Sequence, residues 1–251
     1  MIEVKSPEEL EILRQNATIL GQILDSLIEA VRPGVTTAEL DQLAENAINR
    51  NQATPAFKGY RGFPNTLCAS INEEIVHGIP SARELQEGEV ISMDLGLNKD
   101  GYFADAATTV PVGDQLDPVY RDLIEAGKVA LSSGFGAAVV GNRVSDISHA
   151  VEECVTNHGF SVVREFVGHG IGRNLHEDPQ IPNYGPPGKG ARLQEGMVFA
   201  IEPMLKTDDS PVEILEDGWT AVTENRCPTV HFEGMVVVTD SEPEILVTGG
   251  V

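Results

Sequence analysis

The sequence is poor in cysteine, in aromatic residues and in basic residues. Its 251 residues include 3 cysteines and 1 tryptophan, and aromatic residues make up 5% of the chain. Cys68, Cys154 and Cys227 are scattered and form no Cys-x-x-Cys pair. An odd number of isolated cysteines argues against a disulfide framework and favours a reducing, cytoplasmic location.

Basic residues are outnumbered, with 17 Lys and Arg against 39 Asp and Glu and a formal net charge of −22. Such a surface repels phosphate backbones and anionic lipids, so we expect neither nucleic-acid nor membrane binding. No apolar run approaches the roughly 20 residues that span a bilayer. Acidic residues begin at Glu3 and the N-terminal segment has no long apolar stretch, so we expect no signal peptide.

Helices and strands alternate in a pattern that occurs twice. Ser6-Pro7-Glu8-Glu9 predicts a helix start, and apolar residues at helical spacing then continue to Val31. Further helices are expected over 37–51, 118–140 and 144–158, with strands over 66–71, 90–97 and 101–110 and again from Val162. The order is therefore helix, helix, strands in each half.

A short internal repeat supports this division. Leu85–Leu97 and Leu193–Leu205 align without a gap, and six of the thirteen positions are identical. The block contains a carboxylate at the same place in both copies, Asp94 and Glu202. Two related halves would bring these residues face to face about a pseudo-twofold axis.

The segment from Val90 to Val110 reads as a β-hairpin with a turn at Asn98–Gly101. A turn centred on Lys99-Asp100 places Asp94 directly opposite Asp105, with Cβ atoms roughly 4.5–5.5 Å apart. Two unpaired anions in a largely apolar hairpin are costly, and a divalent cation would remove that cost. The alternative is that both aspartates lie on a solvated face.

Three further acidic or histidine residues lie in strand-like or glycine-rich segments. His169 stands between glycines in Gly-His-Gly-Ile-Gly, which lets backbone or ligand approach closely. Glu202 and Glu233 each adjoin a run that reads as a buried strand. Carboxylates with one imidazole suit Mn, Fe(II), Co or Zn, and a two-metal site would fit hydrolysis.

The ordered set Asp94, Asp105, His169, Glu202 and Glu233 resembles the five metal ligands of type I methionine aminopeptidases. The resemblance covers nearly the whole chain. It implies an α+β pita-bread fold, with two pseudo-twofold-related halves around a central antiparallel β-sheet and a dimetal site at its centre. It implies a single catalytic domain over 1–251, with halves of approximately 1–115 and 116–251.

By the same resemblance, the enzyme removes the initiator methionine of nascent proteins when the second residue is small, by dimetal-activated water attack. Glu202 would shuttle the proton of the water, and His77 and His176 would contact the scissile amide and its carbonyl. The methionine pocket resembles the family's at four positions, Tyr60, Phe63, Cys68 and Trp219. These could also be ordinary core residues.

The sequence departs from the family at a few positions. Phe57 stands where cysteine is frequent, and Leu175 where phenylalanine is frequent. The segment Val230-His231-Phe232-Glu233-Gly234-Met235 replaces the usual Ala-Gln-Phe-Glu-His-Thr. The surroundings of Glu233 are therefore altered, which could tune metal preference or proton transfer.

The same fold also occurs in proteins with other functions. An Xaa-Pro peptidase or prolidase of the same fold would carry an additional N-terminal domain, for which a first helix starting at Ser6 leaves no room. A pita-bread protein that only binds partners would have lost its ligands. The expected cofactors are two divalent ions, Co, Mn, Fe(II) or Zn, and the expected protein is a cytoplasmic monomer that associates transiently with the ribosome.

Overall fold

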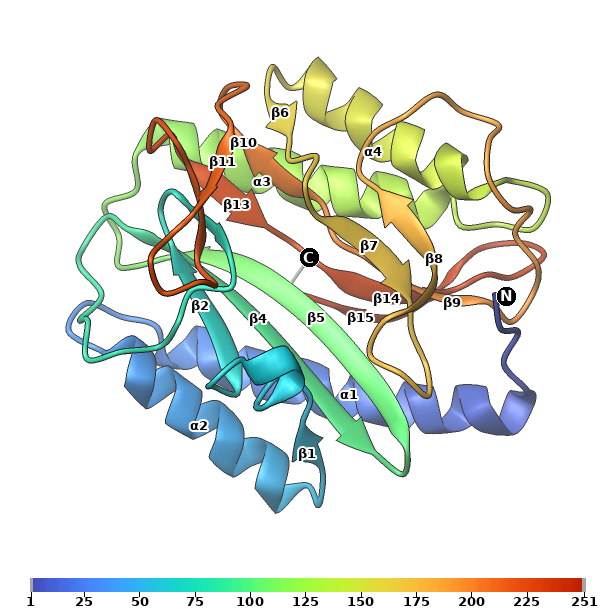
Figure 1. Cartoon of the computed structure of the whole chain (residues 1–251), viewed down its shortest axis with the longest axis horizontal. Coiled ribbons are helices and arrows are strands. Elements are labelled where there is room, and N and C mark those ends of the chain that lie inside the picture. The colour runs from blue at the N-terminus through green and yellow to red at the C-terminus, as the bar shows by residue number, and fades with distance from the viewer. Residues whose placement is uncertain (1, 250–251) are drawn as a thin grey trace.

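The computed structural model describes residues 2–249. It contains four long helices in two pairs, α1 (Pro7–Ala30) with α2 (Thr37–Arg50), and α3 (Pro118–Gly136) with α4 (Val144–Asn157). Figure 1 shows the first pair along one side of the strands and the second pair along the other. Among the described residues, no helix has the length and apolar character needed to cross a bilayer.

The helix starts follow local sequence signals. The Ser6 hydroxyl accepts a hydrogen bond from the Glu9 amide while the Glu9 carboxylate accepts one from the Ser6 amide, a capping box at the predicted helix start. Thr36 and Glu39 repeat the same arrangement at α2. The helices over 37–51, 118–140 and 144–158 are thus confirmed, with slightly earlier ends.

The strands form four small sheets. The first half holds β1 (Thr54–Pro55), β2 (Leu67–Ile71), β3 (Glu74–Val76), β4 (Val90–Lys99) and β5 (Tyr102–Pro111). The second half holds β6 (Ser161–Val162), β7 (Val167–Gly170), β8 (Glu177–Pro182), β9 (Val198–Ile201), β10 (Met204–Lys206), β11 (Val212–Ile214), β12 (Ala221–Thr223), β13 (Thr229–His231), β14 (Gly234–Val237) and β15 (Glu244–Thr248). β4 pairs with β1, β2 and β5, while β15-β14-β9-β7-β8 form a five-stranded sheet.

The predicted β4–β5 hairpin is present, but its register differs from the expected one. The turn is Asp100-Gly101, both at positive φ, so Asp94 pairs with Ala107 and Asp105 with Gly96. Direct opposition of Asp94 and Asp105 was therefore wrong by two residues, because Asp-Gly is the two-residue sequence that this tight turn prefers. A slip of two residues keeps both aspartates on one face of the hairpin, so the two carboxylates remain diagonal neighbours.

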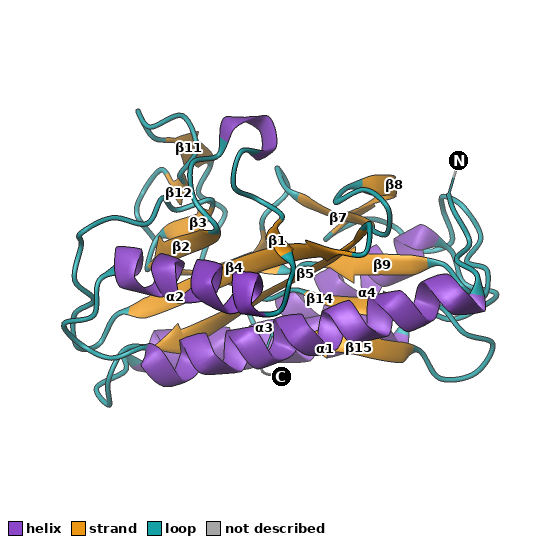
Figure 2. Cartoon of the chain, turned by 90° about the horizontal axis from the view of Figure 1, so that it is seen from below, coloured by secondary structure: helices purple, strands orange, loops and turns teal. Residues whose placement is uncertain are grey.

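The two halves meet along β5 and the start of β14. The amide of Ala107 donates to the carbonyl of Glu233 (3.3 Å), and the amide of Glu233 donates to the carbonyl of Ala107 (2.9 Å). Figure 2 shows the helices on the lower side of the strands, with β11 and the short 3-10 turn η1 (Tyr60–Gly62) rising on the upper side. The upper side is therefore the side on which loops can build a pocket.

Candidate active site

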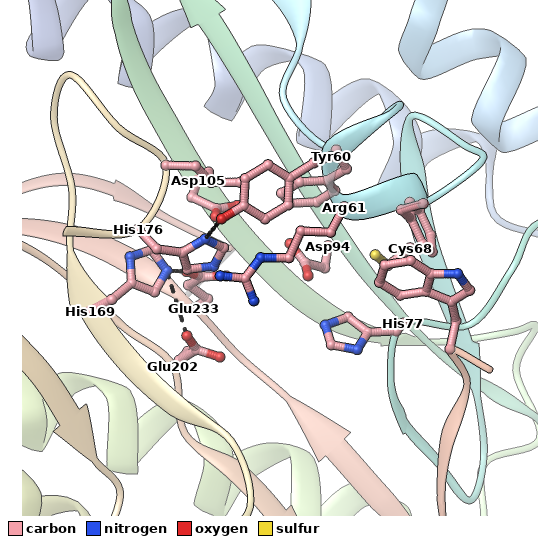
Figure 3. Close-up of a pocket in the computed structure, with 14 residues that line it drawn as sticks. Tyr60, Arg61, Cys68, His77, Asp94, Asp105, His169, His176, Glu202 and Glu233 are labelled. Carbon is pink, nitrogen blue, oxygen red and sulfur yellow. Dashed lines mark hydrogen bonds and ion pairs between the residues drawn. The ribbon is translucent and has the colours of Figure 1, made fainter. Parts of the chain in front are cut away.

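Four carboxylates lie in one row across the junction of the halves. Asp94 on β4 pairs with Ala107, and Ala107 is bonded in turn to Glu233. The β9–β14 register pairs Ile201 with Gly234, so Glu202 and Glu233 occupy the next step of that ladder. Asp105 lies two residues before Ala107 on the same face. The internal repeat thus brings its two equivalent acids, Asp94 and Glu202, into one site, as Figure 3 shows.

These carboxylates are unfavourably placed as free anions. Asp105 and Glu233 are 3% and 2% exposed, and one oxygen each of Asp94, Asp105 and Glu233 is buried without a hydrogen-bond partner in residues 2–249. Loss of hydration raises the pKa of Asp94 to about 7. Burial, followed by the charges of the neighbouring acids, raises the pKa of Asp105, Glu202 and Glu233 well above the usual carboxyl range.

His169 on β7 faces this row with one defined ring nitrogen. Its Nδ1 lies 2.9 Å from the carbonyl oxygen of Gly170, which fixes the proton on Nδ1 and leaves the lone pair on Nε2. Nε2 lies 3.7 Å from Glu202 Oε1 and 3.9 Å from Glu233 Oε1. Burial lowers the pKa of His169 to about 3, so the ring is neutral at physiological pH, as a metal ligand must be.

The donor set fits divalent cations. Ligand atoms of Asp105, His169 and Glu233 all lie within 4.8 Å of one another, and Asp94 and Glu202 line the same cavity as these three residues. Oxygen-rich ligation with one imidazole matches ions such as Mn, Fe(II), Co and Zn. A bound cation would satisfy every one of these buried groups, which hydrogen bonds within the protein leave unsatisfied.

The glycines around His169 serve backbone packing. A Cβ at Gly168 would lie 2.6 Å from the carbonyl oxygen of Ala200, and a Cβ at Gly170 would collide with the carbonyl of Asp178. Of the two expectations for this motif, close approach of backbone is confirmed, because β7 lies between β8 and β9. The third glycine of the motif, Gly172, leaves room for the side chain of Lys5.

A cavity of about 180 Å³ opens above the carboxylates. Its walls contain all eleven residues singled out from the sequence: Tyr60, Phe63, Cys68, His77, Asp94, Asp105, His169, His176, Glu202, Trp219 and Glu233. Phe57, Arg61 and Leu175 complete the wall. The residues come from both halves of the chain, so the cavity exists only once the halves have associated.

His176 and Tyr60 form a pair at this cavity. The Tyr60 hydroxyl lies 2.9 Å from His176 Nδ1, and the His176 ring lies 4.3 Å from that of His169 between centroids. When the hydroxyl donates to Nδ1, the proton of the neutral imidazole resides on Nε2, which can then donate a hydrogen bond. Tyr60, expected in the methionine pocket, therefore also positions His176.

The opposite wall is apolar and aromatic. The Phe63 and Trp219 rings meet edge to face at 5.2 Å, and His77 packs edge-on against Phe166 and Trp219. Cys68 on β2 is 3% exposed and lies opposite Asp94 in the ladder. Burial raises the pKa of its thiol, so Cys68 presents an uncharged sulfur to the cavity.

The sequence did not indicate Arg61 or Lys5 as residues near the site, and it marked His231 only as part of a segment that departs from the family. Arg61 lines the cavity, and the glycines on each side of Tyr60-Arg61 were the sequence signal that could have indicated a tight loop there. Lys5 Nζ lies 2.6 Å from Glu177 Oε2, next to His176, and no local pattern announces that contact. His231 is 2% exposed, and its Nε2 lies 3.8 Å from Glu202 Oε2, so the altered segment does border the site.

Comparison with known proteins agrees with this geometry. Residues 11–240 match the model of metallopeptidase family M24. The chain is 47% identical to a methionine aminopeptidase of Clostridium acetobutylicum over 98% of both chains. It superposes on the crystal structure of methionine aminopeptidase from Rickettsia prowazekii with a TM-score of 0.96 and 34% identity, over 98% of this chain and 99% of that one.

A prolidase from Pyrococcus furiosus is more distant. Its TM-score is 0.79 at 23% identity, over 97% of this chain and 64% of that one, which shows a shared fold alone. The expected pita-bread architecture is confirmed by these superpositions. From the family match, the high identity over nearly the whole chain and the buried Asp, Glu and His set together, the chain belongs to metallopeptidase family M24 and, within it, to the methionine aminopeptidases.

Proposed function

We propose that the protein is a metalloaminopeptidase that removes the initiator methionine from nascent proteins whose second residue is small. The observation that supports this most directly is the convergence of two buried carboxylates, two half-buried carboxylates and the His169 Nε2 beneath a cavity with an apolar wall. The substrate, the N-terminal methionine of a peptide, is inferred from the names of the relatives.

The proposed ligands are Asp94, Asp105, His169, Glu202 and Glu233, which would hold two divalent ions. When bound, such ions supply Lewis acidity and make water nucleophilic near neutral pH. The carboxylates supply negative charge that offsets the ions, while the Gly170 carbonyl keeps the His169 ring in the required tautomer. Co, Mn, Fe(II) and Zn are the candidate ions for this ligand set.

Three residues would handle protons and developing charge. Glu202 is partly open to the cavity, so its carboxylate can take a proton from the attacking water and return it to the leaving amine. His176, oriented by Tyr60, would donate from Nε2 to the carbonyl oxygen as negative charge develops there. His77, whose pKa burial lowers, would be neutral beside the scissile amide.

The methionine side chain would occupy the apolar wall of the cavity. Phe63 and Trp219 offer ring edges and Cys68 a neutral thiol, and a polarizable thioether packs favourably against such groups. We further propose a single catalytic domain over 1–251 with halves of approximately 1–115 and 116–251, acting as a cytoplasmic monomer in transient contact with the ribosome.

The test is hydrolysis by chelator-stripped protein to which Mn, Co, Fe(II) or Zn is returned singly. Met-Ala-Ser and Ala-Pro-Ser are compared as substrates. Metal-dependent release of methionine from the first peptide alone supports the proposal and ranks the ions. Cleavage of Ala-Pro-Ser would favour a prolidase-like activity, and metal binding without cleavage of either peptide would indicate a protein that only binds its partners.

A further inference from the structure

Arg61 lies in a tight, hydrogen-bonded loop at the wall of the cavity. Gly59 and Gly62 have φ values of 87° and 95°, and Arg61 itself lies in the left-handed region at φ 49°, ψ 17°. The Gly59 amide donates to the Phe63 carbonyl at 2.8 Å, which closes the loop. A left-handed backbone is uncommon for arginine, and here it places the side chain at the cavity.

Arg61 has no ion-pair partner among residues 2–249. Within the described part of the chain, five of the eleven arginines are paired with glutamates and Arg61 is one of six that are not; the paired ones are Arg14, Arg83, Arg164, Arg173 and Arg226. Arg61 instead lies with its Cζ 5.4 Å from the centre of the Tyr60 ring. In a chain with 22 excess negative charges, an unpaired guanidinium at a substrate cavity is available to an external anion.

The guanidinium lies beside the two histidines proposed to contact the scissile amide and its carbonyl. Figure 3 shows it drawn between the His176 and His77 rings. Burial lowers the pKa of His176, and the positive charge of Arg61 lowers it further. No other lysine or arginine is among the 14 residues that line the cavity. In the proposed function, a peptide with its methionine against the apolar wall and its scissile bond at His77 and His176 would extend past this group.

We infer that Arg61 is a specificity-determining residue that binds a carboxylate just beyond the scissile bond, so that methionyl peptides with an acidic third residue are preferred substrates. The second residue must be small and cannot reach out, which makes the third residue the first that can present a carboxylate. A guanidinium binds a carboxylate through paired, charge-assisted N–H donors. This inference rests on the proposed aminopeptidase function.

The experiment compares kcat/KM for amidated peptides Met-Ala-X-Gly-Ser, with X as Asp, Asn or Lys, using the metal-loaded enzyme. The amide removes the C-terminal carboxylate, and a free-acid Met-Ala-Ser arm against its amide measures that second source of the same chemistry. An exposed charge pair predicts Asp over Asn by roughly two- to fivefold, with Lys below Asn. The preference should weaken as salt rises.

The variant Arg61→Asn removes the cation with a residue that tolerates a left-handed backbone. It should abolish the Asp-over-Asn preference, and Arg61→Glu should reverse the order of Asp and Lys. Arg121→Gln changes the net charge equally on α3, far along the chain, and should leave the preference intact. Binding to metal-stripped protein, followed by fluorescence of the single Trp219 in the cavity wall, should show the same order.

Equal rates for Asp and Asn peptides in the unmodified enzyme would overturn the inference while leaving the aminopeptidase function standing. An equal loss for all peptides in Arg61→Asn would also overturn it, since that result would assign Arg61 to the peptide backbone. If Met-Ala-Asn-Gly-Ser amide were not cleaved with any of the ions, the proposed function itself would fail.

Discussion

At the scale of single residues, Asp105 offers the sharpest test of the proposed metal site. It is 3% exposed and belongs to the group of potential metal ligands with His169 and Glu233. Asp105→Asn keeps the shape of the side chain but removes the charge that a cation requires. Because outer hydrogen-bond partners alone affect metal affinity by about 10–100-fold, loss of a direct ligand should cost more than about 100-fold.

The measurement is metal content after dialysis, together with turnover of Met-Ala-Ser. Both should fall together in Asp105→Asn. Asp209→Asn, an exposed aspartate in the loop after β10, is the matched control and should retain both. Full metal content and full rate in Asp105→Asn would remove the carboxylate row from the mechanism.

His77 separates binding of metal from turnover. It follows β3 with a left-handed backbone (φ 61°) and lies among aromatic rings, away from the group of Asp105, His169 and Glu233. His77→Ala should therefore keep its metal and lower kcat by about 10²–10³, the usual cost of one preorganised hydrogen-bond group. Metal analysis beside steady-state kinetics decides this, and a loss of metal would place His77 in the ligand set instead.

At the scale of elements, the segment before α1 braces the β7–β8 connection that carries His176. Lys5 Nζ pairs with Glu177 Oε2, whose other oxygen accepts the Asn174 amide at 3.0 Å. The Lys5 and Glu177 side chains are only 2% and 8% exposed. Breaking such a pair from one side leaves an uncompensated buried charge and costs about 3–5 kcal/mol.

Lys5→Met should accordingly lower the denaturation midpoint and raise KM, since the His176 connection loses its brace. Adding Glu177→Gln to Lys5→Met removes the buried carboxylate charge that has lost its partner, while the Gln side chain still offers an acceptor to the Asn174 amide. The double variant should therefore recover part of the lost stability, and a double-mutant cycle by urea unfolding measures the coupling. Strict additivity of the two substitutions would show that the pair contributes nothing.

At the scale of the whole molecule, the carboxylate row makes stability depend jointly on metal and pH. Without metal, burial raises the pKa of Asp94 to about 7 and raises those of Asp105, Glu202 and Glu233. Between the unfolded carboxyl value near 4 and these raised values, the native state binds more protons than the unfolded state. The free energy of unfolding therefore falls as pH rises through that window.

Chelator-stripped protein should thus melt at lower temperature near about pH 8 than near about pH 6.5, and added Mn or Zn should reduce that difference. Below about pH 6.5, the lowered pKa values of the buried His169 and His231 act in the opposite direction, because the unfolded histidines bind protons that the native ones do not. Thermal unfolding by circular dichroism, with and without metal at each pH, provides the measurement. Carboxylates with lowered pKa, such as Glu9 and Asp208, affect stability only at more acidic pH. An identical pH slope in stripped and loaded protein would contradict the prediction.

The sequence by itself determined the helices and the repeat of helix, helix and strands, and its resemblance to a known family indicated eleven of the fourteen residues that line the cavity. The helices and the repeat follow from local hydrogen bonding and from side-chain periodicity, which the chain order contains. The β4 block begins at Val90 and its repeat in β9 begins at Val198, the same alignment that the sequence offered.

Only the tertiary structure decided how these residues meet. The Asp100-Gly101 turn moved the hairpin register by two residues, and the Ala107–Glu233 bonds joined the acids of both halves into one row. The contact of Lys5 with Glu177 spans 172 positions and that of Tyr60 with His176 spans 116. Such pairs depend on how packed elements approach in space, and no periodicity within either segment encodes them.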